Sequence, residues 1–207
     1  MQRSRFLLLL VIGLSFSTLA MADSVVNMTL LGTGSNTSGG YYTYPYYFSI
    51  NGGASTPLMC DSFNNHVSVG ESWTAHVTGL LSGKGLYGNE LSNYKAAGII
   101  FLEMMNNTVS QAAGNVAVWN LFTPGMTTDS AILGIDSSAL AQAKHTKSSY
   151  FKGLVLYTPV GASPGNGPQE YIGYGRPMTT PEPGSMILLG TGLIGIAGIV
   201  RRKMSRG

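Results

Sequence analysis

Cysteine is almost absent from this chain, since Cys60 is the only one among 207 residues. A single cysteine cannot form an intramolecular disulfide, so a fold stabilised by such bonds is excluded. Four alternatives remain for this side chain: a buried small hydrophobic residue, an unpaired thiol, an intermolecular partner or a reactive group.

Charged residues are also scarce, at 10% of the sequence. The formal net charge of +3 first suggests a nucleic-acid ligand, but half of the twelve basic residues lie at the two ends of the chain. Residues 23–178 contain six basic and eight acidic residues, a net charge of −2. This part therefore lacks the basic stripe of a nucleic-acid-binding protein, and we expect no nucleic-acid partner.

The recognised motifs of enzymes and metal proteins are missing as well. The three histidines, His66, His76 and His145, are not at metal-ligand spacing, and there is no His-Glu-x-x-His. There is no Gly-x-Ser-x-Gly elbow, and the glycines of residues 32–34 do not form a phosphate loop followed by a helix. We therefore predict no catalytic residue, no metal site and no cofactor, and we interpret the protein as non-enzymatic.

What the chain does contain is a hydrophobic segment at each end. Residues 1–22 have a basic beginning, an apolar stretch over 6–16 and a small-x-small site at Ala20 and Ala22. This is the pattern of a secretory signal peptide, and cleavage after it makes Asp23 the first residue of the mature protein. We expect the secretory translocon and signal peptidase as partners, and export through the inner membrane.

The C-terminal segment, 181–207, has three parts. It contains a Pro-Glu-Pro box, an apolar run and a basic end. The residues of the box and the basic end that we assign to a sorting signal are Pro181, Glu182, Pro183, Arg201, Arg202 and Lys203. The eighteen uncharged positions between Glu182 and Arg201 span about 27 Å as a helix, close to the hydrocarbon core of a bilayer. We predict a transmembrane helix over 184–200 with a cytoplasmic C-terminus, because basic residues follow the span and none directly precedes it.

This three-part segment resembles the PEP-CTERM sorting signal of Gram-negative bacteria that make exopolysaccharide. The resemblance implies that an exosortase, a membrane-embedded cysteine transpeptidase, reads Pro181, Glu182 and Pro183 and removes the apolar tail. An anchor that is never cut is the alternative. We predict a membrane-anchored protein that reaches the cell surface or extracellular matrix, with a structural or adhesive role in association with exopolysaccharide, as in a biofilm.

Between the two ends, the hydrophobic pattern predicts an exported α+β domain over 23–160. Strand composition and alternation occur in five stretches: 25–31, 41–50, 57–61, 71–78 and 153–160. Helical periodicity predicts two buried helices, at 93–105 and 109–122, and an amphipathic helix at 137–147 capped by Ser137 or Ser138. A Pro/Gly-containing segment, 161–180, holds a last strand at 169–174. This order favours an antiparallel sheet with two buried helices.

A second, weaker resemblance covers roughly residues 41–122. The segments Leu58-Met59-Cys60-Asp61 and Asn115-Val116-Ala117-Val118-Trp119 are similar to those of a bacterial thioester domain, a surface-adhesin module. In that family a cysteine after a strand forms a thioester with the glutamine of a Gln-x-Ala-Ile-Trp motif. Here Asn115 stands at that position, one methylene shorter, and Gln111 lies one helical turn earlier. The resemblance implies a covalent adhesin that uses Cys60 as one alternative function.

A tyrosine-rich stretch, 41–48, is the best candidate for binding. Because alternate residues of a strand share a face, Tyr42, Tyr44 and Tyr46 are predicted to form one row, and Tyr41 and Tyr47 another. Exposed tyrosines stack on sugar rings and offer hydroxyl groups, so a glycan-binding module is the other alternative function. The opposing interpretation is that one row belongs to the core and the other only covers a sheet edge.

Overall fold

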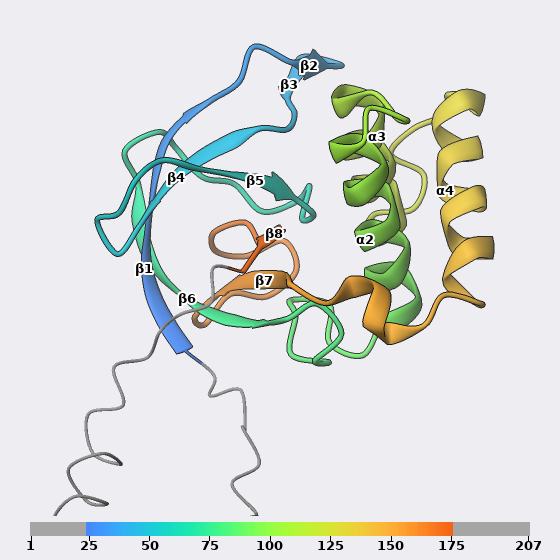
Figure 1. Ribbon diagram of the computed structural model, residues 1–207. Coiled ribbons are helices and arrows are strands. Elements are labelled where there is room, and N and C mark those ends of the chain that lie inside the picture. Colours follow the sequence, from blue (N-terminus) through green and yellow to red (C-terminus); the bar gives the residue numbers. More distant parts are fainter. Residues whose placement is uncertain (1–23, 176–207) are drawn as a thin grey trace, which may run out of the picture. The chain divides into compact units, whose positions relative to one another are not determined.

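Six strands rich in β-branched and aromatic residues close into a barrel, and helices form a layer beside it (Figure 1). The computed structural model describes residues 24–175. The strands in this part of the chain are β1 Ser24–Thr33, β2 Thr37–Ser38, β3 Tyr41–Tyr42, β4 Tyr46–Ile50, β5 Thr56–Cys60, β6 Ser72–Gly79, β7 Leu154–Pro159 and β8 Tyr171–Tyr174. The helices are α2 Leu91–Met105, α3 Gln111–Phe122, α4 Ser130–Ala143 and the short 3-10 helix η1 Ser148–Phe151.

The barrel strands follow the order β1-β4-β5-β8-β7-β6, and each described pair is antiparallel. β8 lies between β5 and β7, with Cys60 opposite Tyr171 and Leu156 opposite Ile172. Closure leaves no free edge on this sheet, which removes a common route to aggregation. The sheet and helices predicted from the sequence are confirmed, whereas the closure of the sheet into a barrel was not predicted.

Aromatic side chains fill the barrel. The ring of Phe48 on β4 lies 4.5 Å from that of Tyr171 on β8 and 5.7 Å from that of Trp73 on β6, measured between centroids. Tyr46 packs on the same Tyr171 ring at 5.5 Å. Burying one large apolar side chain stabilises a fold by about 1.5–3 kcal/mol. Because these rings come from strands far apart in sequence, this core forms only when the barrel closes.

Small residues let helix α2 pack closely. A Cβ atom placed on Gly98 would stand 2.6 Å from Cδ2 of Leu80 and 2.9 Å from Cδ1 of Phe151, closer than side chains approach. Helix α3 begins after Ser110, whose hydroxyl accepts a hydrogen bond from the amide of Ala113, as a helix cap should. Both helices are mostly buried, so the prediction of two buried helices is confirmed, with starts shifted by two residues.

Two elements differ from their predictions. Helix α4 begins at Ser130, because Asp129 caps it by accepting a hydrogen bond from the Ala131 amide at 2.8 Å. Ser137 and Ser138 therefore lie inside the helix, and the predicted cap was wrong. The strand predicted over 41–50 is divided into β3 and β4 at Pro45, which has no amide hydrogen to donate to a neighbouring strand.

Several predictions lie outside the described residues. They are the signal peptide 1–22, the Pro-Glu-Pro box, the helix over 184–200 and the basic end. Within residues 24–175, no helix has both the length and the apolar character needed to cross a membrane.

Candidate binding site

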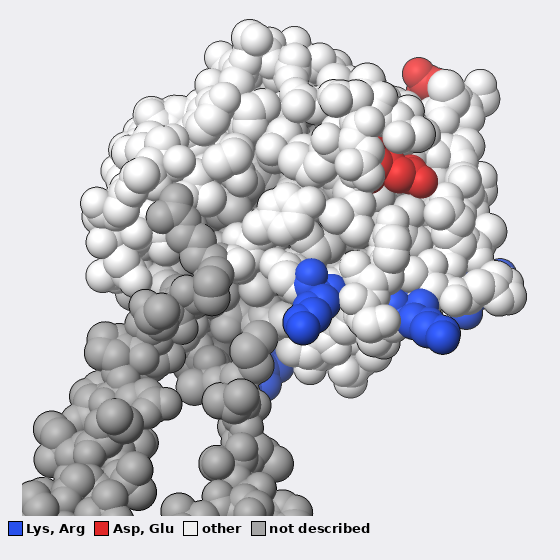
Figure 2. Space-filling view, viewed as in Figure 1, with Lys and Arg blue, Asp and Glu red and all other residues white. Residues whose placement is uncertain are grey.

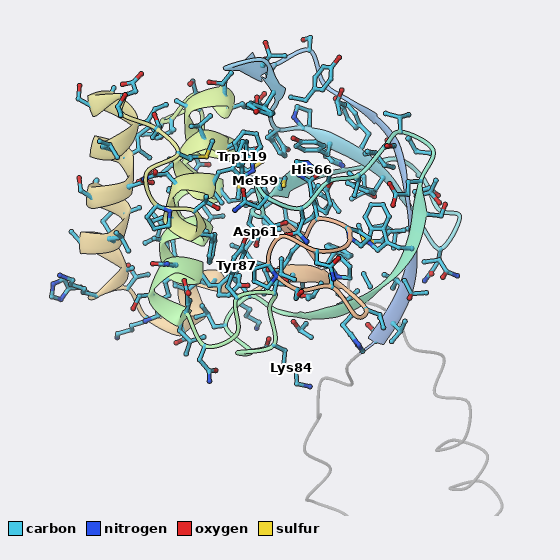
Figure 3. All side chains as sticks on the ribbon, turned by 180° about the vertical axis from the view of Figure 1, so that it is seen from behind. Met59, Asp61, His66, Lys84, Tyr87 and Trp119 are labelled. Carbon is cyan, nitrogen blue, oxygen red and sulfur yellow. The ribbon has the colours of Figure 1, made fainter. Side chains whose placement is uncertain are left out.

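A pocket of about 380 Å³ lies where β1, the β2–β3 region and helix α3 come together with the loop after β5. Its wall brings together residues from distant parts of the sequence, and six of them are aromatic: Tyr41, Tyr42, Tyr46, Phe63, His66 and Trp119. Figure 3 shows Trp119 and His66 at the same end of the domain, with Asp61 and Tyr87 closer to its middle. The pocket is thus a product of the tertiary fold and of no single motif.

Three rings lead from the surface into this pocket. The Tyr41 side chain is 52% exposed and meets the Phe63 ring edge-on, at a centroid distance of 4.9 Å. Phe63 in turn packs against Trp119 at 5.2 Å, with the two planes tilted by 54°. Trp119 is only 2% exposed, so exposure falls steadily along the row. The three rings therefore form an apolar surface that is exposed to solvent at Tyr41 and buried at Trp119.

Polar groups on the wall are oriented by hydrogen bonds within the domain. The Gln169 carboxamide oxygen accepts a hydrogen bond from the Tyr171 hydroxyl at 2.8 Å. The Tyr46 hydroxyl donates to the Tyr42 carbonyl. The Ser68 amide donates to a carboxylate oxygen of Glu71 at 2.9 Å. These bonds fix the polar atoms in advance, which lowers the entropy cost of binding a ligand.

The predicted tyrosine row does not form. Tyr42 is 55% exposed, but Tyr44 and Tyr46 are each only 6% exposed. Tyr44 turns toward helix α2, where its hydroxyl donates to the Met105 sulfur at 3.5 Å. Division of the strand at Pro45 breaks the two-residue alternation on which the prediction depended. Tyr42 and Tyr46 still line the pocket, and Tyr41 stands there in place of Tyr44.

Cys60 and Asn115, which the sequence suggested as a pair, are brought together. The Asn115 side-chain amide donates to the Cys60 carbonyl at 2.8 Å, and its oxygen accepts from the Tyr44 amide at 2.7 Å. Gln111 is engaged elsewhere, because its side-chain oxygen accepts a hydrogen bond from Asn36 at 2.8 Å. The carboxamide of Asn115 therefore connects α3 to β5 through hydrogen bonds.

The thiol of Cys60 is poorly placed for reaction. It is fully buried and donates a weak hydrogen bond to the Ser62 carbonyl at 3.7 Å. Burial raises the pKa of the Cys60 thiol to about 12, so the thiol holds its proton at neutral pH. The protonated form is the less nucleophilic one. In this structure Cys60 is a free, buried side chain.

Two buried carboxyl groups, Asp61 and Glu170, form a cluster that the sequence did not reveal. Both residues are 0% exposed. Glu170 accepts hydrogen bonds from the Tyr94 hydroxyl at 2.7 Å, from the Leu86 amide at 2.8 Å and from the Thr158 hydroxyl. Neither side-chain oxygen of Asp61 accepts a hydrogen bond from another residue in the described part of the chain. Asp61 therefore lacks the donors that a buried carboxylate needs.

The lack of donors at Asp61 agrees with the direction in which its pKa is shifted. Burial raises the pKa of Asp61 well above its usual value, and the neighbouring charge of Glu170 raises it further. The raised pKa favours the protonated, neutral form of Asp61. Both carboxyl groups are buried, away from the pocket wall, so the pair connects β5 to β8 and, through Tyr94, to helix α2.

The residues that sequence reasoning missed are Phe63, His66, Trp119 and Gln169 on the pocket wall, and the buried acids. Phe63 and His66 lie in the polar loop directly after Cys60. A large aromatic residue in such a loop was the feature of the sequence that could have indicated a binding residue. Among residues 24–175, no group of three or more His, Cys, Asp or Glu side chains is arranged to hold a metal ion.

Comparison with known proteins concerns the other end of the chain. Residues 179–203 match the family model of the PEP-CTERM protein-sorting motif. This chain carries a PEP-CTERM sorting signal. The resemblance found in the sequence is thereby confirmed, and the matched range contains Pro181, Glu182, Pro183 and the basic residues from Arg201 to Lys203. The motif supports an exported protein that is sorted by exosortase, a membrane protease.

Searches of curated proteins and of solved structures gave no match to the PEP-CTERM chain. The resemblance to thioester domains therefore gains no support from these comparisons.

Proposed function

We propose that the exported domain is a non-enzymatic adhesion module that binds polysaccharide at the cell surface or in the surrounding matrix. The observation that carries this proposal is the row of rings Tyr41, Phe63 and Trp119 along an open pocket. Aromatic rings present flat apolar surfaces on which the apolar faces of sugars stack, and tyrosine adds a hydroxyl group. A rigid apolar wall with a few oriented polar atoms is typical of small-ligand sites.

The size of the pocket is compatible with such a ligand. Its volume of about 380 Å³ is near the lower end of the range of about 300–1,000 Å³ found for ligand sites. A short segment of a polysaccharide fits this scale, while the rest of the polymer extends into solvent past the exposed Tyr41 and Tyr42.

The sorting signal supports the location of this activity. Export and recognition by exosortase bring the domain to the outer side of the inner membrane and onward to the surface. A protein delivered to that environment meets polysaccharide at high local concentration, so a modest affinity at each pocket is enough for adhesion. Exopolysaccharide is therefore the ligand that we propose.

A non-enzymatic role is supported by the position of the acidic residues. General acid–base chemistry needs a carboxyl group within hydrogen-bond reach of the substrate. Asp61 and Glu170 are fully buried, and neither lines the pocket. The two buried acids are therefore structural, and we assign them no role at the ligand.

Binding of the protein released from the producing cells to their own exopolysaccharide tests the proposal. We expect Tyr41→Ala and Phe63→Ala each to weaken binding about fivefold, which corresponds to about 1 kcal/mol for one aromatic contact. Calorimetry or quenching of Trp fluorescence measures the affinity. Tyr150→Ala is a matched control, because Tyr150 is 55% exposed and belongs to η1, outside the pocket wall.

Two results would contradict this proposal. One is no binding of the released protein to any polysaccharide of the matrix. The other is an equal loss of affinity in the Tyr150→Ala control, which would place the contact surface elsewhere.

The covalent alternative rests on the contact between Asn115 and Cys60. A thioester would form when the Cys60 sulfur attacks the Asn115 carboxamide carbon and releases ammonia. The intact mass of the released protein would then be lower than the calculated mass by one ammonia. The Cys60→Ala variant would show no such loss. The burial of Cys60 and its protonated thiol favour non-covalent adhesion, for which the full mass is expected.

A further inference from the structure

We infer that the pocket selects neutral glycans and discriminates against acidic ones. This inference rests on the proposed function and adds the chemical class of the ligand. It is argued from where the charged side chains lie relative to the pocket wall.

Among residues 24–175, no Lys, Arg, Asp or Glu belongs to the pocket wall. Its polar side chains are those of the tyrosines, His66, Thr33, Ser68 and Gln169. Hydroxyl and carboxamide groups pair well with the hydroxyl groups of neutral sugars. Carboxylate and sulfate groups are bound most strongly by lysine and by the two-pronged guanidinium of arginine. A uronate or sulfated sugar would give up its hydration at this wall and gain no ion pair in return.

The lysines of the described residues lie away from the wall. They are Lys84, Lys95, Lys144, Lys147 and Lys152. Lys95 on α2 donates to the Thr146 carbonyl at 3.3 Å, which places it beside the end of α4. Figure 3 shows Lys84 pointing outward at the end of the domain opposite Trp119 and His66. In Figure 2, the basic side chains gather below the helices, and the visible surface over the barrel is uncharged.

One carboxylate, that of Glu71, stands beside the pocket. The Glu71 amide donates to the Ser68 carbonyl at 3.0 Å, and the Ser68 amide donates to the Glu71 carboxylate at 2.9 Å. These two bonds close a turn whose other end, Ser68, belongs to the pocket wall. The negative charge is therefore held next to the wall and repels an anionic ligand.

The test uses one oligosaccharide in two charge states. Alginate oligomers are compared with the same oligomers after their carboxyl groups have been reduced to alcohols, so that linkage and length stay constant. With the full-length protein in detergent at pH 8, we expect the reduced oligomer to bind at least tenfold more tightly. Raising the salt concentration should reduce this difference in affinity, because salt screens the repulsion between the Glu71 carboxylate and the acidic oligomer.

A variant of Glu71 tests whether its carboxylate causes the weaker binding of the acidic oligomer. Glu71→Gln keeps an acceptor for the Ser68 amide but removes the charge. We expect it to improve binding of the acidic oligomer severalfold and to leave binding of the reduced oligomer unchanged. Glu103→Gln is the matched control: Glu103 lies on α2, where it accepts a hydrogen bond from Gln142, and it should change neither affinity.

The outcomes separate the inference from the function on which it rests. Equal or tighter binding of the acidic oligomer would overturn the selectivity and leave glycan binding in place. Absence of binding for both oligomers and for the producer's exopolysaccharide would overturn the two together.

Discussion

At the scale of single residues, the buried acids Asp61 and Glu170 relate the stability of the domain to pH. Glu170 accepts hydrogen bonds from three different segments, whereas the side-chain oxygens of Asp61 accept none within residues 24–175. A buried carboxylate without donors costs several kcal/mol, so the protonated form of Asp61 is the one compatible with its site. The pair therefore makes the stability of the domain depend on pH.

Asp61→Asn should reduce this pH dependence. The pKa of Asp61 is raised in the folded protein, so above the usual pKa of about 3.9 the folded state holds one proton more than the unfolded state. Stability is then greatest at low pH and falls as pH rises toward the raised pKa, by about 1.4 kcal/mol per pH unit. Asparagine has nearly the same size as aspartate and binds no proton. Urea unfolding between pH 5 and 8 measures the slope.

The matched control for this experiment is Asp129→Asn. Asp129 is exposed, and asparagine also caps helices, so the same chemical change should leave the slope unaltered. Equal slopes in the wild-type protein and Asp61→Asn would show that no proton is held by this pair.

At the scale of elements, a single side chain organises the Pro/Gly loop before β8. The Asn65 amide nitrogen lies 3.0–3.3 Å from four backbone carbonyls of this loop, and its oxygen accepts from the Gly165 amide at 2.9 Å. Asn65 is 1% exposed. The loop, 161–168, has little regular structure of its own, so its conformation depends on this residue from the loop after the neighbouring strand β5.

Asn65→Asp should destabilise the domain strongly. The change replaces a donor by a negatively charged oxygen that faces several carbonyl groups, and we expect a loss of about 3 kcal/mol in the free energy of unfolding at pH 7. Chemical unfolding followed by fluorescence measures the loss. Asn64→Asp makes the same change at the adjacent exposed position and should stay within about 0.5 kcal/mol of wild type. Similar losses in both variants would contradict the role given to Asn65.

Element positions were predicted well where local signals were strong. Periodicity placed α2 and α3 within two residues, because apolar spacing acts between residues three or four positions apart. The third helix was placed too late, since the predicted caps, Ser137 and Ser138, compete with Asp129, and the sequence does not say which is used. The pocket was predicted only in part, because its wall includes Phe63 and Trp119, which meet through folding.

At the scale of the whole molecule, the barrel depends on its last strand. β8 pairs with both β5 and β7, and its residues Tyr171 and Ile172 are fully buried. Glu170, directly before it, joins the strand to helix α2 through Tyr94. The exported domain observed here therefore extends to Tyr174 and includes the strand predicted within 161–180.

Truncation before β8 should prevent folding. A chain of residues 23–168 lacks the strand that closes the barrel, so we expect no cooperative unfolding transition, because its core and two strand edges would be open to water. A chain of residues 23–175 should unfold cooperatively. Circular dichroism during heating distinguishes the two. A sharp transition in the shorter chain, at the same temperature as in the longer one, would show that β8 is dispensable.

The sequence by itself determined the sorting signal, the low charge of the exported part and the positions of most strands and helices. Each of these depends on composition or on spacing between near neighbours. Only the tertiary structure decided that the sheet closes, that Tyr41 and Phe63 rather than Tyr44 face the pocket, and that Asp61 meets Glu170. The physical reason is that burial and pairing arise from contacts between distant segments, which local pattern does not encode.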